Sequence, residues 1–351
     1  MIAENERLKL GAHNLLFNCA NLSTHDKLLI VSEDPSLGWY SKNIAGFIAN
    51  QAKSLGITTT ILEVDAPNND SKKDLNRLID TFDCVIFFAR IGDQQRFKAQ
   101  KSETKRVMAY VRDENSLASA FGCVPQQALV SLKEAIDLIF LHANEVKITC
   151  PLGTNLSGEY KMENKNLIYD VGVTRFPLAV PAPVNANALN GRVALSKYLT
   201  PTGSKVYKPT SVAINKIVYS NLRNGRISGF EGDQEVIKTI ENHYSSVSRK
   251  FNIDKDFVHS WHAGIHPGIQ YDKTIAEDPD RWSNTMFASP KYCHFHTCGN
   301  YAPGEICWMV GNPTIIIDGK ALWEDGVMRN ENFPETFDCI KSWKALNKLF
   351  K

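Results

Sequence analysis

The sequence predicts an α/β protein: an amino-terminal doubly wound parallel-sheet domain followed by a mostly β, mixed α+β carboxy-terminal domain. Up to about residue 150, short β-branched runs alternate with helical stretches, which is typical of a parallel sheet covered on both faces. Beyond that point, prolines, glycines and asparagines punctuate short strands, and helical stretches become rare. A chain of 351 residues is long enough for two domains, which we place at 1–150 and 151–351.

The amino-terminal elements follow from the spacing of apolar side chains. Strands are expected at 27–34, 58–65, 83–90 and 105–113. Helices are expected at 41–55 and 125–144. The first strand leads into VSEDPSLGW, which has neither the glycine fingerprint of dinucleotide-binding proteins nor a Walker lysine. The sequence therefore disfavours nucleotide binding at this turn.

The carboxy-terminal elements are marked by turn signals. Asn224-Gly225 is a strong signal for a two-residue type I′ hairpin. A helix is expected at 233–249, a second hairpin at 314–323 and a closing helix at 335–350. This order of elements supports a sheet-rich second domain.

Composition excludes several classes of partner. The net charge of +2 gives no electrostatic footprint for nucleic acid or for an anionic membrane. No apolar run approaches the roughly 18 residues that a membrane span requires, and the amino terminus lacks the apolar core of a signal peptide. Eight scattered cysteines form no regular framework, which favours reduced thiols. We expect a cytoplasmic protein that binds neither nucleic acid nor membranes.

Five of the nine histidines fall in two short runs, VHSWHAGIHPG and YCHFHTCGNY, and Glu305 and Cys307 follow closely. Imidazole, carboxylate and thiolate are the groups that bind first-row transition metals. Packing alone gives no reason to crowd them in one stretch. The sequence therefore predicts a metal site in this window.

Strand geometry suggests how the ligands could meet. Residues two apart in a strand point to the same face, so His294 and His296 share a face, as do Glu305 and Cys307. The first run could add a third ligand, which would give a site of two histidines and one carboxylate, or a site with one thiolate. The candidate metal ligands are His259, His262, His294, His296, Glu305 and Cys307. His266 and Tyr301 are the candidate catalytic residues.

A plainer interpretation exists for each of these residues. A single histidine in an apolar strand is more often a hydrogen-bonded core residue than a ligand, and buried cysteine behaves as a small hydrophobic side chain. Packing is the favoured role for Cys293 and Cys298, while Cys307 stays open between the two roles. The chain has no CxxC pair, which disfavours a structural zinc knuckle, and no GxSxG nucleophile motif.

The order of motifs resembles that of the aminopeptidase T metallopeptidases and their relatives, the dihydroxypyridine dioxygenases. The resemblance spreads over most of the chain. It is carried by TNL at 154–156, FPLAVPAPVNANALNGRVALS at 176–196, NGRISGFEGDQEVIKTI at 224–240, HAGIHPG at 262–268, HFHTCG at 294–299 and EICWMVGNPTIIIDG at 305–319. It implies the same order of an α/β part followed by a β-rich part.

Several acidic ligands of the peptidases are replaced in this chain. Ala179 and Val180 stand where the resemblance implies a glutamate, and Ser260 stands where it implies another. The peptidases' closing His-x-Asp pair corresponds to Glu305 and Cys307. His294 and Tyr301 reproduce the spacing of the group's histidine and tyrosine. A paired-metal hydrolase needs a bridging carboxylate, so these losses argue against peptide hydrolysis.

The dioxygenase relatives imply a mononuclear iron(II) site of two histidines and one aspartate. In this chain one histidine of the first run, His294 or His296, and Glu305 could rebuild such a triad. Our first hypothesis is an iron(II)-dependent oxygenase-like enzyme acting on a small aromatic or amino-acid-derived molecule. The alternatives are an aminopeptidase-like hydrolase that uses zinc or cobalt on peptides, and a metal-free binding or scaffold protein. The resemblance also implies a homodimer or a larger homo-oligomer.

Overall fold

The computed structural model describes residues 4–67, 72–95, 103–160, 172–201, 207–299 and 305–351. Two compact units divide the chain. Unit 1 comprises residues 1–131 and 170–178, and unit 2 comprises residues 132–169 and 179–350. The predicted fold class is confirmed, because a parallel sheet occupies the first unit and a mostly antiparallel sheet the second.

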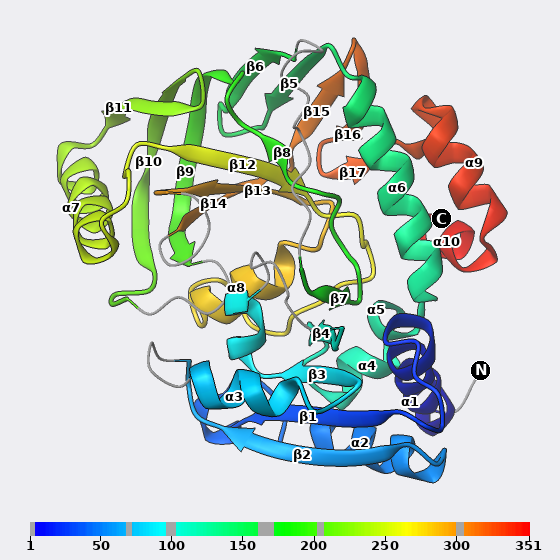
Figure 1. Cartoon of the computed structure of the whole chain (residues 1–351). Coiled ribbons are helices and arrows are strands. Elements are labelled where there is room, and N and C mark those ends of the chain that lie inside the picture. The colour runs from blue at the N-terminus through cyan, green and yellow to red at the C-terminus, as the bar shows by residue number, and fades with distance from the viewer. Residues whose placement is uncertain (1–3, 68–71, 96–102, 161–171, 202–206, 300–304) are drawn as a thin grey trace. The chain divides into compact units, whose positions relative to one another are not determined.

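Unit 1 is built on a five-stranded parallel sheet with the order β2-β1-β3-β4-β7 (Figure 1). Its strands are β1 (Lys27–Glu33), β2 (Thr58–Val64), β3 (Cys84–Phe88), β4 (Lys105–Ala109) and β7 (Thr174–Phe176). All five residues of β3 are buried, which explains its continuous apolar run. The first four strands confirm the prediction, although β4 ends at Ala109 rather than residue 113.

Strand β7 was not predicted. It returns from beyond residue 150 to pair with β4, with Val107 opposite Thr174 and Ala109 opposite Phe176. Three residues are too few for a periodic pattern, so only the pairing reveals this strand.

Short helices accompany the sheet of unit 1. They are α1 (Glu4–His13), a π-helical segment at Asn14–Cys19, a 3₁₀ turn at Pro35–Leu37, α2 (Ile44–Ser54), α3 (Lys72–Ile79), a 3₁₀ segment at Arg90–Gln95, α4 (Glu114–Ala118) and α5 (Ala120–Cys123). Helix α2 confirms the prediction for 41–55 and contacts β1 and β2, and Ile44 and Ile48 are among its buried residues. Helix α6 (Gln126–His142) confirms the next predicted helix and runs from unit 1 into unit 2.

Unit 2 is built on a twelve-stranded sheet whose main path is β17-β16-β15-β5-β6-β9-β14-β13-β12-β8, with β10 joined to β9 and β11 (Figure 1). Its strands are β5 (Glu145–Thr149), β6 (Asn155–Glu159), β8 (Val184–Asn185), β9 (Asn190–Pro201), β10 (Val212–Arg223), β11 (Arg226–Gly232), β12 (Val258–Ala263), β13 (Tyr292–Thr297), β14 (Ile306–Gly311), β15 (Thr314–Ile317), β16 (Lys320–Glu324) and β17 (Val327–Met328).

Both predicted hairpins are confirmed. Strands β10 and β11 meet at Asn224 and Gly225, whose φ angles of 50° and 68° are those of a type I′ turn. Strands β15 and β16 form the second hairpin. The turn chemistry of the sequence thus fixes these two elements locally.

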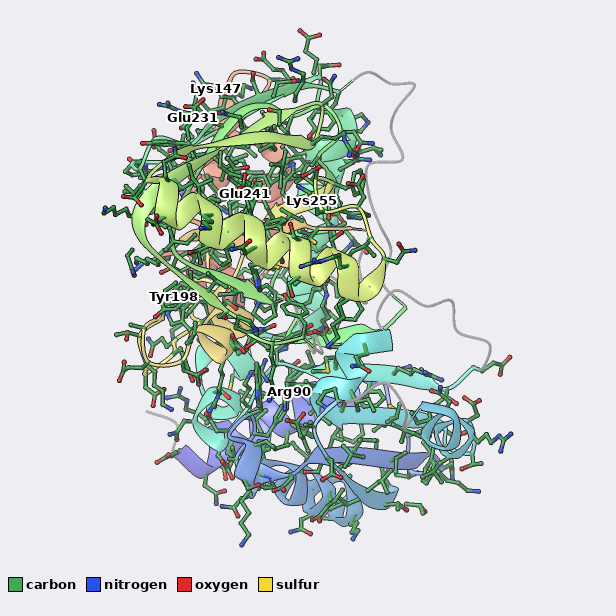
Figure 2. The ribbon with its side chains drawn as sticks, turned by 90° about the vertical axis from the view of Figure 1, so that its left-hand side faces the viewer. Arg90, Lys147, Tyr198, Glu231, Glu241 and Lys255 are labelled. Atoms are coloured by element: carbon green, nitrogen blue, oxygen red, sulfur yellow. The ribbon has the colours of Figure 1, made fainter. Side chains whose placement is uncertain are left out.

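The helices that belong wholly to unit 2 are α7 (Gln234–Phe251), α8 (Pro279–Met286), α9 (Pro334–Ser342) and α10 (Lys344–Leu349), with a 3₁₀ turn at Asn330–Asn332. Figure 2 shows α7 in front of the sheet, with Glu241 on the helix. The prediction of one closing helix was wrong, because Trp343 adopts an extended backbone and separates α9 from α10. Among the helices in the described ranges, none is long and apolar enough to cross a membrane.

Candidate metal centre

The histidine-rich segments form the neighbouring strands β12 and β13, and β14 pairs with the other side of β13. In their antiparallel pairing His262 lies opposite His294, Ser260 opposite His296, and His296 opposite Cys307. Side chains that face each other across antiparallel strands project from the same side of the sheet. The register therefore gathers the three imidazoles on one face.

The opposite face of the same strands is an aromatic core. Trp261 and Phe295 alternate with the histidines, and their ring centroids lie 6.3 Å apart. Trp308 of β14 continues this face at 5.9 Å from Phe295, and Phe140 of α6 packs on Trp261 at 5.5 Å. Burial of these large rings anchors the strands, so the imidazole face is held by a rigid layer behind it.

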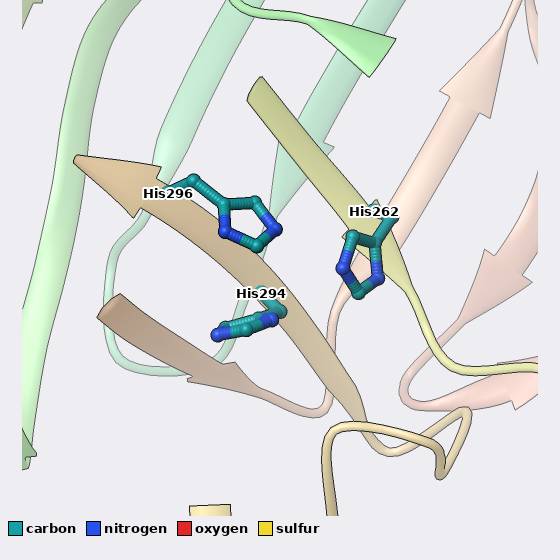
Figure 3. A group of neighbouring side chains, drawn as sticks. All are labelled: His262, His294 and His296. Carbon is teal, nitrogen blue, oxygen red and sulfur yellow. The ribbon is translucent and has the colours of Figure 1, made fainter. Parts of the chain in front are cut away.

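His262, His294 and His296 present one ring nitrogen each to a common space, and these nitrogens lie within 4.8 Å of one another. Figure 3 shows His294 and His296 on one strand and His262 on its neighbour, with the rings turned toward one another. The ring centroids are 4.7 Å apart for His294 and His296, and 5.1 and 5.3 Å from His262 to these two rings. All three side chains are buried.

This donor set fits a transition-metal ion. Imidazole nitrogens bind zinc at about 2.1 Å, so two nitrogens on one tetrahedral ion lie about 3.4 Å apart. The three nitrogens lie within 4.8 Å of one another, so each ring would have to move by at most about 0.7 Å to bind one ion. Within the described part of the chain, no other group of three or more such ligands comes this close together.

Glu305 lies outside this group but contacts it. Its Oε1 is 3.3 Å from Nδ1 of His296, and the carboxylate is fully buried. The backbone of Glu305 has a φ of 100°, which is unusual for a residue other than glycine, and its carbonyl accepts a hydrogen bond of 2.6 Å from Tyr207. A carboxylate in this place can orient the imidazole, and the other ring nitrogen would then be the one to bind an ion.

The other candidates of the first histidine run lie outside the group of three. His259 Nδ1 is 2.8 Å from the hydroxyl of Ser260, and burial lowers the pKa of His259 to about 4, with a further contribution from His296. His266 accepts a hydrogen bond of 3.2 Å from the backbone N–H of Gly268 through Nδ1. Complete burial lowers the pKa of His266 to about 4. Both rings are therefore neutral at pH 7.

Cys307 projects from the same face as His296, but its sulfur does not join the group of three. Burial is complete for Cys307, as it is for Cys293 and Cys298, whose sulfurs also lie outside that group. Tyr301 lies outside the described residues.

Two residues near the imidazoles were not predicted from the sequence to belong to the site. Phe287, which follows α8, places its ring 6.2 Å from His262 and 5.9 Å from His294, measured between centroids. Thr200 of β9 lies opposite Cys307 and is buried, and its hydroxyl has no hydrogen-bond partner within the described ranges. Neither carries a sequence signal, because only the pairing of distant segments brings them to this face.

Comparison with known proteins identifies the fold. No protein-family profile and no curated protein sequence matches the chain. Among solved structures, 2,5-dihydroxypyridine dioxygenase from Pseudomonas putida is similar with a TM-score of 0.64 and 12% identity, and the match covers 96% of this chain and 100% of that one.

A second solved structure, aminopeptidase T (AmpT) from Thermus thermophilus, is similar with a TM-score of 0.53 and 11% identity. That match covers 93% of this chain and 100% of the other. The predicted resemblance to both groups is confirmed as a likeness of fold. A shared fold at this identity leaves the reaction to be argued from the site.

Proposed function

We propose that the chain is a mononuclear iron(II)-dependent oxygenase that acts on a small aromatic or amino-acid-derived molecule. The observation that carries this proposal is the convergence of His262, His294 and His296 on one buried face of the sheet. Three ligands on one side leave coordination positions open for a substrate and for dioxygen.

The site favours one ion over two. A paired-metal hydrolase needs carboxylates that bridge its ions, together with a base that activates water. In the ranges that the structure describes, the only grouping of ligand atoms is made of three imidazoles, and Glu305 contacts it from beside His296. Ala179 and Ser260 stand at positions where the aminopeptidases imply carboxylates.

Two residues around the imidazoles would support the site. Glu305 holds the ring of His296 in one orientation through the contact at Nδ1. Phe287 limits the space beside His262 and His294, which restricts water near the ligands. Held by these three imidazoles, an iron(II) ion would supply the redox chemistry for the activation of dioxygen beside a substrate.

Reconstitution tests the proposal. Protein purified without oxygen and loaded with iron(II) should bind one ion per chain and consume oxygen in the presence of a substrate from an aromatic panel that includes 2,5-dihydroxypyridine. Variants His262→Ala and His294→Ala should lose the iron, while His142→Ala, which changes an exposed histidine of α6, should keep it. Equal iron content in all four proteins would refute the assignment of the ligands.

A zinc-dependent or cobalt-dependent hydrolase is the second candidate, because three imidazoles are also a ligand set of catalytic zinc. Its support is the likeness of fold to aminopeptidase T. Release of amino acids from a peptide panel after loading with zinc or cobalt, without oxygen uptake after loading with iron(II), would favour this candidate.

A further inference from the structure

The parallel sheet of unit 1 changes its direction of winding between β1 and β3. From β1 the chain passes to β2 on one side and then returns to β3 on the other side of β1. In open α/β sheets, ligands bind beyond the carboxyl ends of the strands at such a reversal. The two strands end there at Glu33 and Phe88, so a ligand of this sheet is expected beside these two residues.

A buried ion pair occupies this edge. Glu33 is 1% exposed and accepts from the backbone N–H of Arg90 at 2.8 Å and from its Nε at 2.8 Å. The Nη2 of Arg90 lies 2.7 Å from the same carboxylate. Glu33 thus engages the Nε and Nη2 edge of the guanidinium. The Nη1 end is left as a donor on a side chain that is 18% exposed.

The ring of one tryptophan lies close to this arginine and to a second one. Trp39, which lies between β1 and α2 and is half-buried, has the guanidinium carbon of Arg90 at 4.4 Å from its ring centroid. Arg112, which follows β4, lies 5.0 Å from the same ring and 5.2 Å from the ring of Tyr40. Two guanidinium groups therefore gather around one indole.

The support beneath these rings is rigid. The hydroxyl of Tyr40 donates to the carbonyl of Ala109 at 3.0 Å, and burial raises the pKa of Tyr40 to about 12. Arg112, Glu33, Asp93 and Arg90 all act electrostatically on this phenol. Asp93 accepts from the hydroxyl of Tyr110 at 3.0 Å. Both carboxylates are thus engaged inside the protein.

We infer that this cluster binds a small oxyanion, either a carboxylate or a phosphate, through Arg90 and Arg112 beside Trp39. Guanidinium groups match both kinds of oxyanion with paired donors, and the ion pair with Glu33 holds Arg90 in place before a ligand arrives. Such preorganisation lowers the entropic cost of binding. The cluster belongs entirely to unit 1, so this inference does not depend on the metal site of unit 2.

Fluorine NMR of the full metal-free chain labelled with 5-fluorotryptophan provides the test. The chain has six tryptophans, and Trp39→Phe identifies the resonance of Trp39 by its loss. Titration with inorganic phosphate and with benzoate, at matched ionic strength in chloride, separates the two kinds of oxyanion. We expect a saturable shift of the Trp39 resonance with at least one of them, while the other five resonances stay in place.

Arg90→Lys should raise the dissociation constant roughly tenfold, because lysine offers no paired donors and stacks less well on indole. Arg112→Lys serves as a second variant if the first disturbs the fold. The control Arg329→Lys changes an exposed arginine that pairs with Glu324 and should leave binding unchanged. Absence of a saturable shift in the unaltered chain would overturn the inference and leave a structural ion-pair network only, as would equal binding by the arginine variants.

Discussion

Among single residues, the three histidines of the candidate site come from two neighbouring strands, with His262 on β12 and His294 and His296 on β13. Two-residue spacing places His294 and His296 on one face of a strand, and the structure brings both into the group of three. The sequence could not choose among the histidines of the first run, because that choice depends on the register. His262 lies opposite His294, whereas His259 lies near a shift in the pairing and His266 lies beyond β12.

The position of Glu305 supports a role different from the one that the sequence suggested. The sequence suggested a ligand, while its position beside Nδ1 of His296 supports an orienting carboxylate. Glu305→Gln keeps the size of the side chain and removes its charge. We expect the affinity for iron(II) to fall about 10- to 100-fold, as measured by competition with a chelator.

Glu324→Gln, at an exposed ion pair with Arg329, is the matched control for this prediction and should keep the affinity. A loss as complete as in His294→Ala would mean that Glu305 binds the ion itself. An unchanged affinity would mean that the contact with His296 has no influence on binding.

Buried histidines also predict how stability depends on pH. Burial lowers the pKa of His243 and of His266 from 6.5 to about 4. The unfolded chain therefore binds protons more readily, and the free energy of unfolding should fall as the pH falls from about 6.5 toward 4. Each of the two rings should lower the free energy of unfolding by up to about 2 kcal/mol at pH 5.

Urea denaturation of the metal-free protein at pH 7 and pH 5 measures this loss. His243→Gln should reduce the difference between the two conditions. His142→Gln, at an exposed position on α6, should not change it. A free energy of unfolding that is equal at both pH values would contradict the prediction.

Among the helices and strands, those with a strong sequence pattern were predicted, whereas short ones and those that depend on tertiary pairing were not. The strands β1 to β4 and the turn at Asn224-Gly225 follow from local chemistry. Strand β7 is only three residues long and exists through its pairing with β4. The break at Trp343 involves neither glycine nor proline, so no local signal marks it.

The end of β12 depends on a close backbone approach at Gly264. A Cβ there would come within 2.3 Å of the backbone of Ala288 and Ser289. Neighbouring Ile265 and His266 are fixed by backbone hydrogen bonds to Ala179 and Ala288. Gly264 is thus required for the turn that follows His262, two residues away.

Gly264→Ala should therefore lower the free energy of unfolding by several kcal/mol, on the order of an overpacked core, and weaken metal binding. Gly46→Ala, on α2 where a Cβ meets nothing within 4 Å, is the control and should raise stability by up to about 1 kcal/mol. Denaturant titration of both variants checks the pair. Similar effects of the two substitutions would contradict the close approach.

At the scale of the whole molecule, the chain shares its fold with a dioxygenase and with an aminopeptidase, so the fold does not decide the reaction. The reaction has to be argued from the group of three imidazoles, which has a buried carboxylate beside one of them. The resemblance could be predicted from the order of motifs. The grouping of the three imidazoles could not be predicted, because it depends on how distant strands pair.

Metal binding should stabilise the folded chain as a whole. Iron(II) at 100 times its dissociation constant should add about 2.7 kcal/mol, provided that the unfolded chain does not bind it. Thermal unfolding without oxygen should show a higher midpoint with iron(II) in the unaltered protein and in His142→Ala. His294→Ala should show no such rise, and a rise in that variant would place the ion elsewhere.

Anomalous X-ray scattering from a crystal, recorded at the iron and zinc edges, would locate a bound ion and identify its element. One peak should lie among the ring nitrogens of His262, His294 and His296, and its edge would name the metal. Crystals grown with iron(II) or zinc that show no peak there, or a peak at other residues, would contradict a metal site at these three histidines.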